Sequence, residues 1–151
     1  KFYVVTNKET INLFSKEITK IAAKEFLKAG PVKIIKGVIS LLRFSHGLHF
    51  PKTRDHVFYQ APVVIFIAAP KNNEWAALDV GMCAQNIMLA SKSMGLDSCP
   101  VGFGKYIQYT RLYPQLHIPA SEQIYLSIIL GYGDETPAVH KRITKNAIFI
   151  D

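Results

Sequence analysis

Residues 79–103 read DVGMCAQNIMLASKSMGLDSCPVGF, and this stretch decides the fold of the chain. Between Ala76 and Ser91 the only charged residue is Asp79. A helix that is apolar nearly all round is covered on all sides. We therefore predict a helix from about Glu74 to Met94 that packs both against its own sheet and against a second subunit.

A helix of this length and composition also has to be tested as a membrane span. Asp79, Gln85 and Asn86 lie within it, and such polar groups are costly in a bilayer. The turn Gly95-Leu96-Asp97 then leads into a short predicted strand at Ser98–Val101. These features exclude a membrane span and favour a helix inside a globular domain.

Two further apolar runs predict the centre of the sheet. Val63–Ala68 and Ile124–Leu130 are rich in β-branched residues without alternation, so both of their faces must be covered. Buried strands separated by helices indicate a layered domain of helices and strands, and we expect one domain over residues 1–151. The other predicted elements are a strand at Phe2–Val5, a helix from a Thr6–Glu9 capping box to Gly30-Pro31, and helices at Val32–Phe44 and from Gly104 to about Tyr113. The run Ala147–Ile150 is expected to add a strand at a sheet edge, in its own subunit or in a partner subunit.

The composition is that of a folded protein with a basic surface. The chain has 18 Lys and Arg against 11 Asp and Glu, a net charge of +7. Lys16, Lys20, Lys24 and Lys28 recur every four residues, which favours a solvated helix face over a phosphate site. Cys83 and Cys99 form no metal or redox motif, and they are typical of a reducing, cytoplasmic compartment.

Several familiar sites are excluded by spacing. Gly102-Phe-Gly104 and Gly131-Tyr-Gly133 begin like dinucleotide loops, but Ile107 and Thr136 stand where the third glycine belongs. The sequence has no phosphate loop, nucleophile elbow or zinc-protease motif. Nucleic-acid binding would rest on charge alone, so we expect no nucleic-acid partner.

The segment Ser45–Tyr59 has little periodicity and is expected to be a lid or binding loop. It contains His46, His49 and His56, whose only acidic neighbour at useful spacing is Asp55. We therefore expect no metal site. The role of the three histidines stays open at this point.

The remaining candidate site combines a backbone turn with a basic pair. The glycines of Pro100–Gly104 would let a flat ring approach the main chain closely. Lys141 and Arg142 suit a phosphate monoester. Together they could hold a phosphorylated, flat cofactor.

At this point the order of segments resembles the nitroreductase family. The resemblance covers essentially the whole chain and is weakest across residues 29–57. It is carried by Ala61-Pro62-Val63-Val64-Ile65, by Asp79-x-Gly81-x-x-x-Gln85-Asn86-x-x-Leu89-Ala90, by Gly95 to Phe103, by Leu116-His-Ile-Pro119, by Leu130 to Glu135 and by Lys141-Arg142.

The resemblance implies an α+β fold with a mixed central β-sheet flanked by helices, in an intertwined homodimer that binds FMN at the subunit interface. It implies two-electron reduction of nitroaromatic, quinone or related small-molecule acceptors, with NAD(P)H as the electron donor. The implied cofactor-binding residues are Pro100, Val101 and Gly102 at the reactive N5 edge of the flavin and Lys141 and Arg142 at its phosphate. No catalytic side chain is expected, because the flavin carries the chemistry.

The chain also departs from the family pattern. The family's phosphate-binding segment, rich in Arg and Ser, is expected upstream of Lys1, which is not a Met and is expected to lie inside a longer gene product. Val101 stands where many relatives carry an acidic residue. A flavin-free binding or scaffold dimer on the same fold is therefore the alternative. The physiological substrate and the choice among NADH, NADPH and ferredoxin as donor stay open.

Overall fold

The structure is a computed structural model that describes residues 1–28, 55–135, 139, 147, 148 and 150. Its elements in chain order are β1 (Phe2–Val5), α1 (Lys8–Lys28), β2 (Val63–Pro70), α3 (Ala76–Ser93), β3 (Asp97–Val101), the 3-10 helices η1 (Gly102–Tyr109) and η2 (Tyr113–Leu116), and β4 (Glu122–Gly131). The strands predicted at Phe2–Val5, Val63–Ala68, Ser98–Val101 and Ile124–Leu130 and the long apolar helix are confirmed, whereas no strand is formed by the described residues of Ala147–Ile150. The helix predicted at Val32–Phe44 lies outside the described residues, as does most of the predicted lid.

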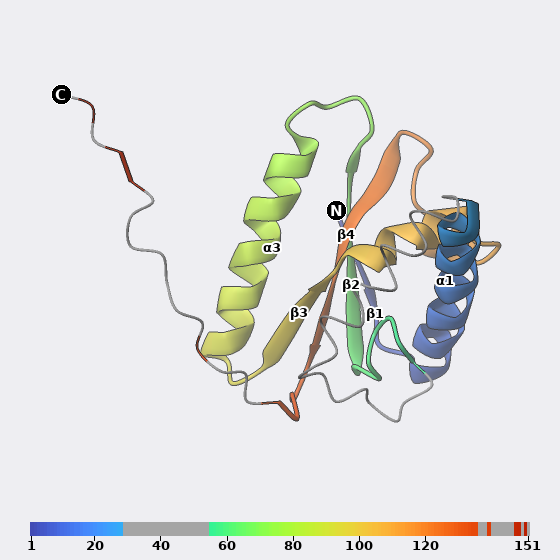
Figure 1. Cartoon of the computed structure of the whole chain (residues 1–151), viewed down its shortest axis with the longest axis horizontal. Helices are drawn as coiled ribbons and strands as arrows, with labels where there is room; N and C mark the ends of the chain where they lie inside the picture. Colours follow the sequence, from blue (N-terminus) through green and yellow to red (C-terminus); the bar gives the residue numbers. More distant parts are fainter. Residues whose placement is uncertain (29–54, 136–138, 140–146, 149, 151) are drawn as a thin grey trace.

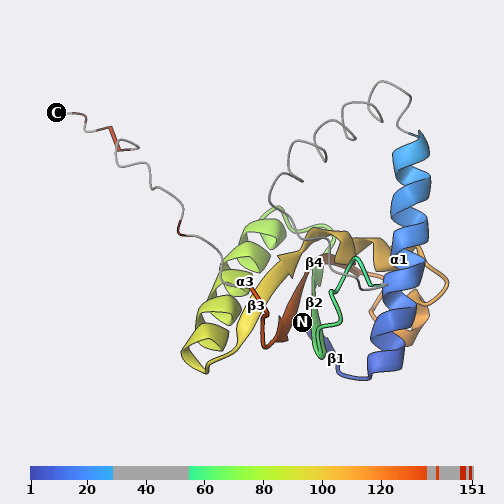
Figure 2. The same ribbon diagram turned by 60° about the horizontal axis from the view of Figure 1, so that its bottom comes forward.

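The strands form one sheet in the order β1-β2-β4-β3, with β2 and β4 at its centre. Helix α3 covers one face, and α1 with η1 covers the other (Figures 1 and 2). Each pair of neighbouring strands in the described part is antiparallel. The parallel pairing that a mixed sheet requires is thus not among the described strands.

Two hydrophobic clusters form the core, one on each face of the sheet. The cluster beneath α3 is built on Ile67, Val80, Ala84 and Ile128. The larger cluster lies beneath α1 and η1. Its buried members are Ile11, Phe14, Ile18, Val57, Phe58, Val64, Phe66, Ala68, Val101, Ile107, Leu116, Ile124 and Ile129. Both faces of the central strands are therefore covered, as the unbroken apolar runs predict.

Helix α1 is amphipathic as predicted, with the described lysines Lys16, Lys20 and Lys24 exposed. The predicted Thr6–Glu9 capping box is wrong. Asn7 caps the helix instead, because its Oδ1 accepts hydrogen bonds from the N–H and the hydroxyl of Thr10, at 2.9 and 3.0 Å. Asparagine is at least as good a cap as threonine, so the competition between neighbouring residues favours Asn7.

Helix α3 is not covered all round by the part of the chain that the structure describes. Its buried residues Ala76, Val80, Ala84 and Ser91 lie on the side that faces the sheet. On the other side Leu78, Met82 and Leu89 are 55%, 62% and 60% exposed. The apolar composition predicted burial on all sides, and the described part of the chain buries the side that faces the sheet. No helix in the described part of the chain is both long and apolar enough to cross a membrane.

Helix η1 lies unusually close to β4. A Cβ added to Gly104 would lie 1.8 Å from Ser127 Oγ and 2.6 Å from Ser127 Cβ. Ser127 is fully buried, and its hydroxyl donates a hydrogen bond of 2.9 Å to the carbonyl oxygen of Val101. The missing side chain at position 104 therefore lets η1 pack directly on the sheet at the point where β3 ends.

The buried carboxylate of Asp55 ties the segment before β2 to α1. It accepts hydrogen bonds from the Ser15 hydroxyl and from the backbone N–H groups of Val57, Phe58 and Gln60. Burial alone would raise the pKa of Asp55, but these donors outweigh burial and hold the pKa below its usual value. The ionised form is therefore the one that the fold stabilises.

We predict that Asp55→Asn lowers the free energy of unfolding by about 2 kcal/mol at neutral pH, because hydrogen bonds to a charged acceptor become bonds to a neutral one. The folded-state pKa is depressed, so this stabilisation is present above the unfolded pKa and is lost as pH falls through the folded pKa. Urea unfolding of the wild type and of Asp55→Asn at several pH values measures the difference in their free energies of unfolding. A loss that stays constant down to acidic pH would contradict the assignment. Asp97→Asn, at an exposed carboxylate, is the control and should lower the free energy of unfolding by less than Asp55→Asn does.

A second prediction concerns the close packing of η1 on β4. Gly104→Ala should destabilise the fold by about 1–3 kcal/mol, because the new methyl group overlaps Ser127. The matched control is Gly102→Ala in the same helix, where a Cβ would meet no atom within 4 Å. Thermal unfolding without added ligand should separate the two variants. Equal melting temperatures for them would refute the packing described for Gly104.

Candidate functional site

The predicted cofactor turn lies at the end of an edge strand. Pro100 and Val101 are the last residues of β3, and Gly102 is the first residue of η1. Pro100 and Gly102 are exposed, whereas the Val101 side chain is buried in the larger core cluster. Position 101 therefore offers a ligand its backbone and not its side chain, and an acidic residue there is not needed to form the turn.

The space in front of the turn is open. A Cβ added to Gly102 would meet no atom within 4 Å. Gly102 begins a helix, and the first N–H groups of a helix have no acceptor within it. The turn thus combines a backbone N–H at the start of a helix with space beside Gly102, and the approach of a flavin N5 edge, which the resemblance implies, stays a prediction.

The position of the turn is fixed from behind by β4. Val101 pairs with Ser127, and the Ser127 hydroxyl holds the Val101 carbonyl. Gly104 packs against the same serine. Sequence reasoning missed Ser127, although its signal was present: it is the only hydrophilic residue in the run Ile124–Leu130 apart from the hydroxyl of Tyr125.

The other end of β3 is anchored by Asp97. Its carboxylate accepts hydrogen bonds from Lys92 Nζ at 2.9 Å and from the N–H of Gly133 at 3.0 Å. The Lys92 ammonium and the Gly133 N–H hold the pKa of Asp97 below its usual value. The chain that follows β4 therefore leaves the sheet beside the start of β3, near the end of α3.

Lys141 and Arg142 lie outside the described residues, so the basic half of the predicted site stays a prediction. The same holds for His46 and His49, while His56 is described and exposed. No group of three or more metal-ligating side chains occurs among the described residues. Cys83 and Cys99 are both free thiols.

Aromatic side chains line η1 directly after the turn. The rings of Phe103 and Tyr106 are 6.0 Å apart, and those of Tyr106 and Tyr109 are 6.2 Å apart. Steps of three residues place them on one face of a 3-10 helix. Lys105 Nζ lies 5.7 Å from the centre of the Tyr106 ring. The surface beside the turn is thus aromatic and basic.

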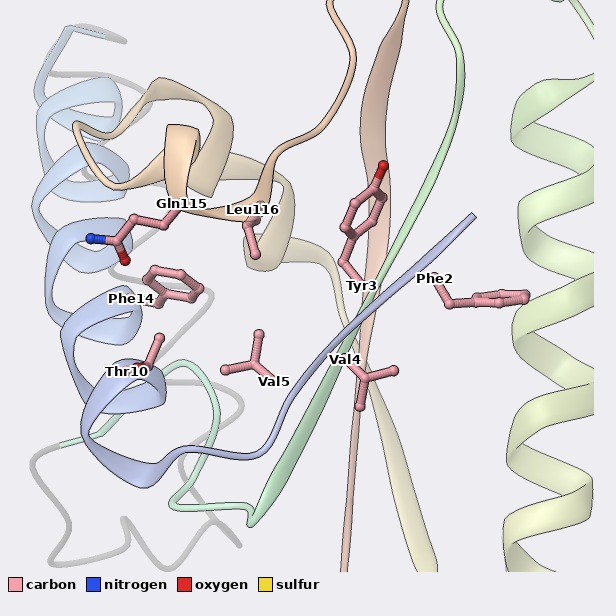
Figure 3. Close-up of a pocket in the computed structure, with 8 residues that line it drawn as sticks. All are labelled: Phe2, Tyr3, Val4, Val5, Thr10, Phe14, Gln115 and Leu116. Carbon is pink, nitrogen blue, oxygen red and sulfur yellow. The ribbon is translucent and has the colours of Figure 1, made fainter.

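A pocket lies elsewhere in the described structure, beside β1. This pocket of about 510 Å³ is lined by Phe2, Tyr3, Val4, Val5, Thr10, Phe14, Gln115 and Leu116 (Figure 3). None of these residues is cationic, and none belongs to the predicted cofactor set. Its size therefore does not make it the better candidate for a phosphorylated cofactor, which requires positive charge.

Comparisons with known proteins agree with the resemblance seen in the sequence. The chloronitrobenzene nitroreductase of Comamonas testosteroni is 35% identical over 89 residues, which cover 58% of this chain and 39% of that protein. The 4-nitrobenzoate reductase of Pseudomonas putida is 33% identical over 85 residues, covering 55% of this chain and 37% of that protein. The chain thus matches less than half the length of these relatives.

Solved structures show the same fold. A nitroreductase with bound FMN from Bacteroides fragilis superposes with a TM-score of 0.68 at 20% identity, covering 99% of this chain and 74% of that chain. An FMN-dependent nitroreductase from Mycobacterium smegmatis in complex with NADPH gives 0.65 at 21% identity, covering 100% of this chain and 78% of that chain. Residues 1–132 match the nitroreductase family, and the chain belongs to that family.

Proposed function

We propose that this protein is an FMN-dependent oxidoreductase that reduces nitroaromatic, quinone or related acceptors with two electrons from NAD(P)H. The observation that carries this proposal is the open backbone turn at Pro100, Val101 and Gly102. It places a glycine, at which a Cβ would meet no atom within 4 Å, directly after a strand of a fold whose solved relatives include FMN-bound nitroreductases.

The residues of the turn suit a flavin. An isoalloxazine ring is flat and has acceptor atoms along its edge, so it requires close approach to backbone donors more than side-chain contacts. Gly102 allows that approach because a side chain is missing and the space before it is empty. We propose that Lys141 and Arg142 bind the FMN phosphate, for which their geometry and charge are suited.

The bound FMN would supply the electron transfer itself. The protein would bind the cofactor, orient it and exclude water from it. We therefore assign no catalytic side chain. NAD(P)H is the proposed donor, in keeping with the NADPH complex of the Mycobacterium smegmatis relative.

We further propose a homodimer in which the exposed face of α3 is the subunit contact. Leu78, Met82 and Leu89 give this face its apolar character, and an open groove of about 480 Å³ runs along it beside Gly81, Gln85 and Asn86. Isolated exposed apolar residues are common, but three large ones on one helix face indicate an interaction surface.

The predicted strand at Ala147–Ile150 is not formed in the described residues of the chain. Ile148 and Ile150 are 89% and 93% exposed. We propose that this run is covered in the dimer, where it would add a strand to an edge of the partner's sheet.

Flavin uptake tests the function directly. The purified protein should be yellow, or become yellow with added FMN, and should release FMN on denaturation. Gly102→Val should weaken FMN binding by at least about tenfold, because its side chain fills the space before the turn, while the ligand-free stability stays within about 0.5 kcal/mol of the wild type. A colourless protein that does not take up FMN would overturn the proposal in favour of the flavin-free dimer.

The dimer contact has its own test. Leu89→Lys should shift the protein towards monomer in sedimentation velocity, because an unpaired charge would be buried at the contact. Met88 differs from Leu89 because it is half-buried against the sheet. Met88→Lys should therefore destabilise the monomer as well as the dimer. Leu13→Lys, at an exposed leucine of α1, is the control and should leave the assembly unchanged. A Leu89→Lys protein that stays dimeric would rule out this face.

A further inference from the structure

We propose that Ser127 is a positioning residue for the flavin, acting through the peptide bond between Val101 and Gly102. This inference rests on the proposed function. Ser127 lies in β4 and is fully buried, so it cannot touch a ligand in front of the turn. Its hydroxyl donates to the carbonyl oxygen of Val101 at 2.9 Å.

The orientation of the Gly102 N–H follows from this hydrogen bond. The Val101 carbonyl and the Gly102 N–H belong to the same planar peptide unit, and no cis peptide bond occurs among the described residues. In a trans peptide the two groups point in opposite directions. Because Ser127 holds the carbonyl from the side of β4, the N–H is directed away from β4. β3 is an edge strand among the described strands, so none of them lies in that direction.

Gly104 makes the arrangement rigid. The close approach of η1 to Ser127 leaves no room for a side chain at position 104, and Thr110 ends η1 by donating its hydroxyl to Ile107 O at 2.7 Å. The helix therefore lies directly on the serine whose hydroxyl holds the turn. A peptide that is held in this way has little freedom to rotate, and its N–H is presented to a ligand at no further entropic cost.

The hydrogen bond also strengthens the donor. A donor on the carbonyl of a peptide polarises the whole unit, so its N–H becomes a better donor in turn. The N5 atom of an oxidised flavin accepts a hydrogen bond, whereas N5 of the reduced flavin carries a hydrogen. An oriented N–H facing N5 therefore stabilises the oxidised ring, and Ser127 sets how strongly it does so.

The test is Ser127→Ala compared with Ser91→Ala. Ser91 is a matched control, because it is also buried and donates its hydroxyl to a backbone carbonyl, Ile87 O at 2.7 Å, but it lies in α3. In the ligand-free protein, Ser127→Ala should move the Gly102 amide resonance in a nitrogen–proton NMR spectrum, and Ser91→Ala should leave it in place. This NMR measurement does not require bound FMN.

In the FMN-loaded protein, Ser127→Ala should weaken binding of oxidised FMN roughly three- to tenfold relative to reduced FMN. For a two-electron couple this ratio raises the reduction potential by about 15 to 30 mV. Ser91→Ala should leave the potential unchanged even if it lowers stability. Ser127→Cys, which keeps a weaker donor, should fall between wild type and Ser127→Ala, and it carries the test if Ser127→Ala does not fold.

The outcomes separate this inference from the function on which it rests. If the wild type takes up FMN and the potential is the same in the Ser127 and Ser91 variants, Ser127 is only a packing residue and the inference is overturned. An unmoved Gly102 resonance in Ser127→Ala would overturn the proposed link between the serine and the turn. If the wild type does not bind FMN, the proposed function fails first, and the flavin role of Ser127 fails with it.

Discussion

Strand β4 pairs with β2 along all eight residues of β2, and this central pairing determines where every other described element can lie. Both strands are apolar on both faces, so each face needs a cover, and the two helical layers supply it. Strands β1 and β3 are left as the edges. Polar backbone groups at an edge remain available to other molecules, and the two edges of this sheet differ in what they offer.

The proposed ligand site lies at the β3 edge, and a pocket lies beside β1. Strand β3 is followed by the exposed Gly102, whose peptide bond with Val101 is held from the interior by Ser127. Asp97 anchors the other end of the same strand to α3 and to the chain after β4. The strand that carries the turn is thus fixed at both ends. The lining of the pocket beside β1 supplies no positive charge.

The sequence predicted the layers well and the contacts between them poorly. Unbroken apolar runs such as Val63–Ala68 identify central strands, because burial on both faces leaves a strong compositional signal. The exposed half of α3 could not be separated from its buried half in this way, since both halves are apolar. The cap at Asn7 was misplaced by one residue because Thr6 and Asn7 are both good caps.

Spacing and resemblance nominated Pro100, Val101 and Gly102, which the structure places where β3 ends and η1 begins, and their contact with a cofactor stays a prediction. They did not identify Ser127 and Gly104, because the importance of both residues depends on a contact between segments far apart in the sequence. Asp55 was missed for the same reason, since its role depends on reaching Ser15.

A crystal structure of the protein with FMN bound would test the central claim most directly. The account predicts that the isoalloxazine ring lies against the turn after β3, with the Gly102 N–H within hydrogen-bond distance of N5 and the Ser127 hydroxyl still on the Val101 carbonyl. A flavin bound elsewhere, for example in the pocket along β1, or a Gly102 N–H that points away from the ring, would contradict it.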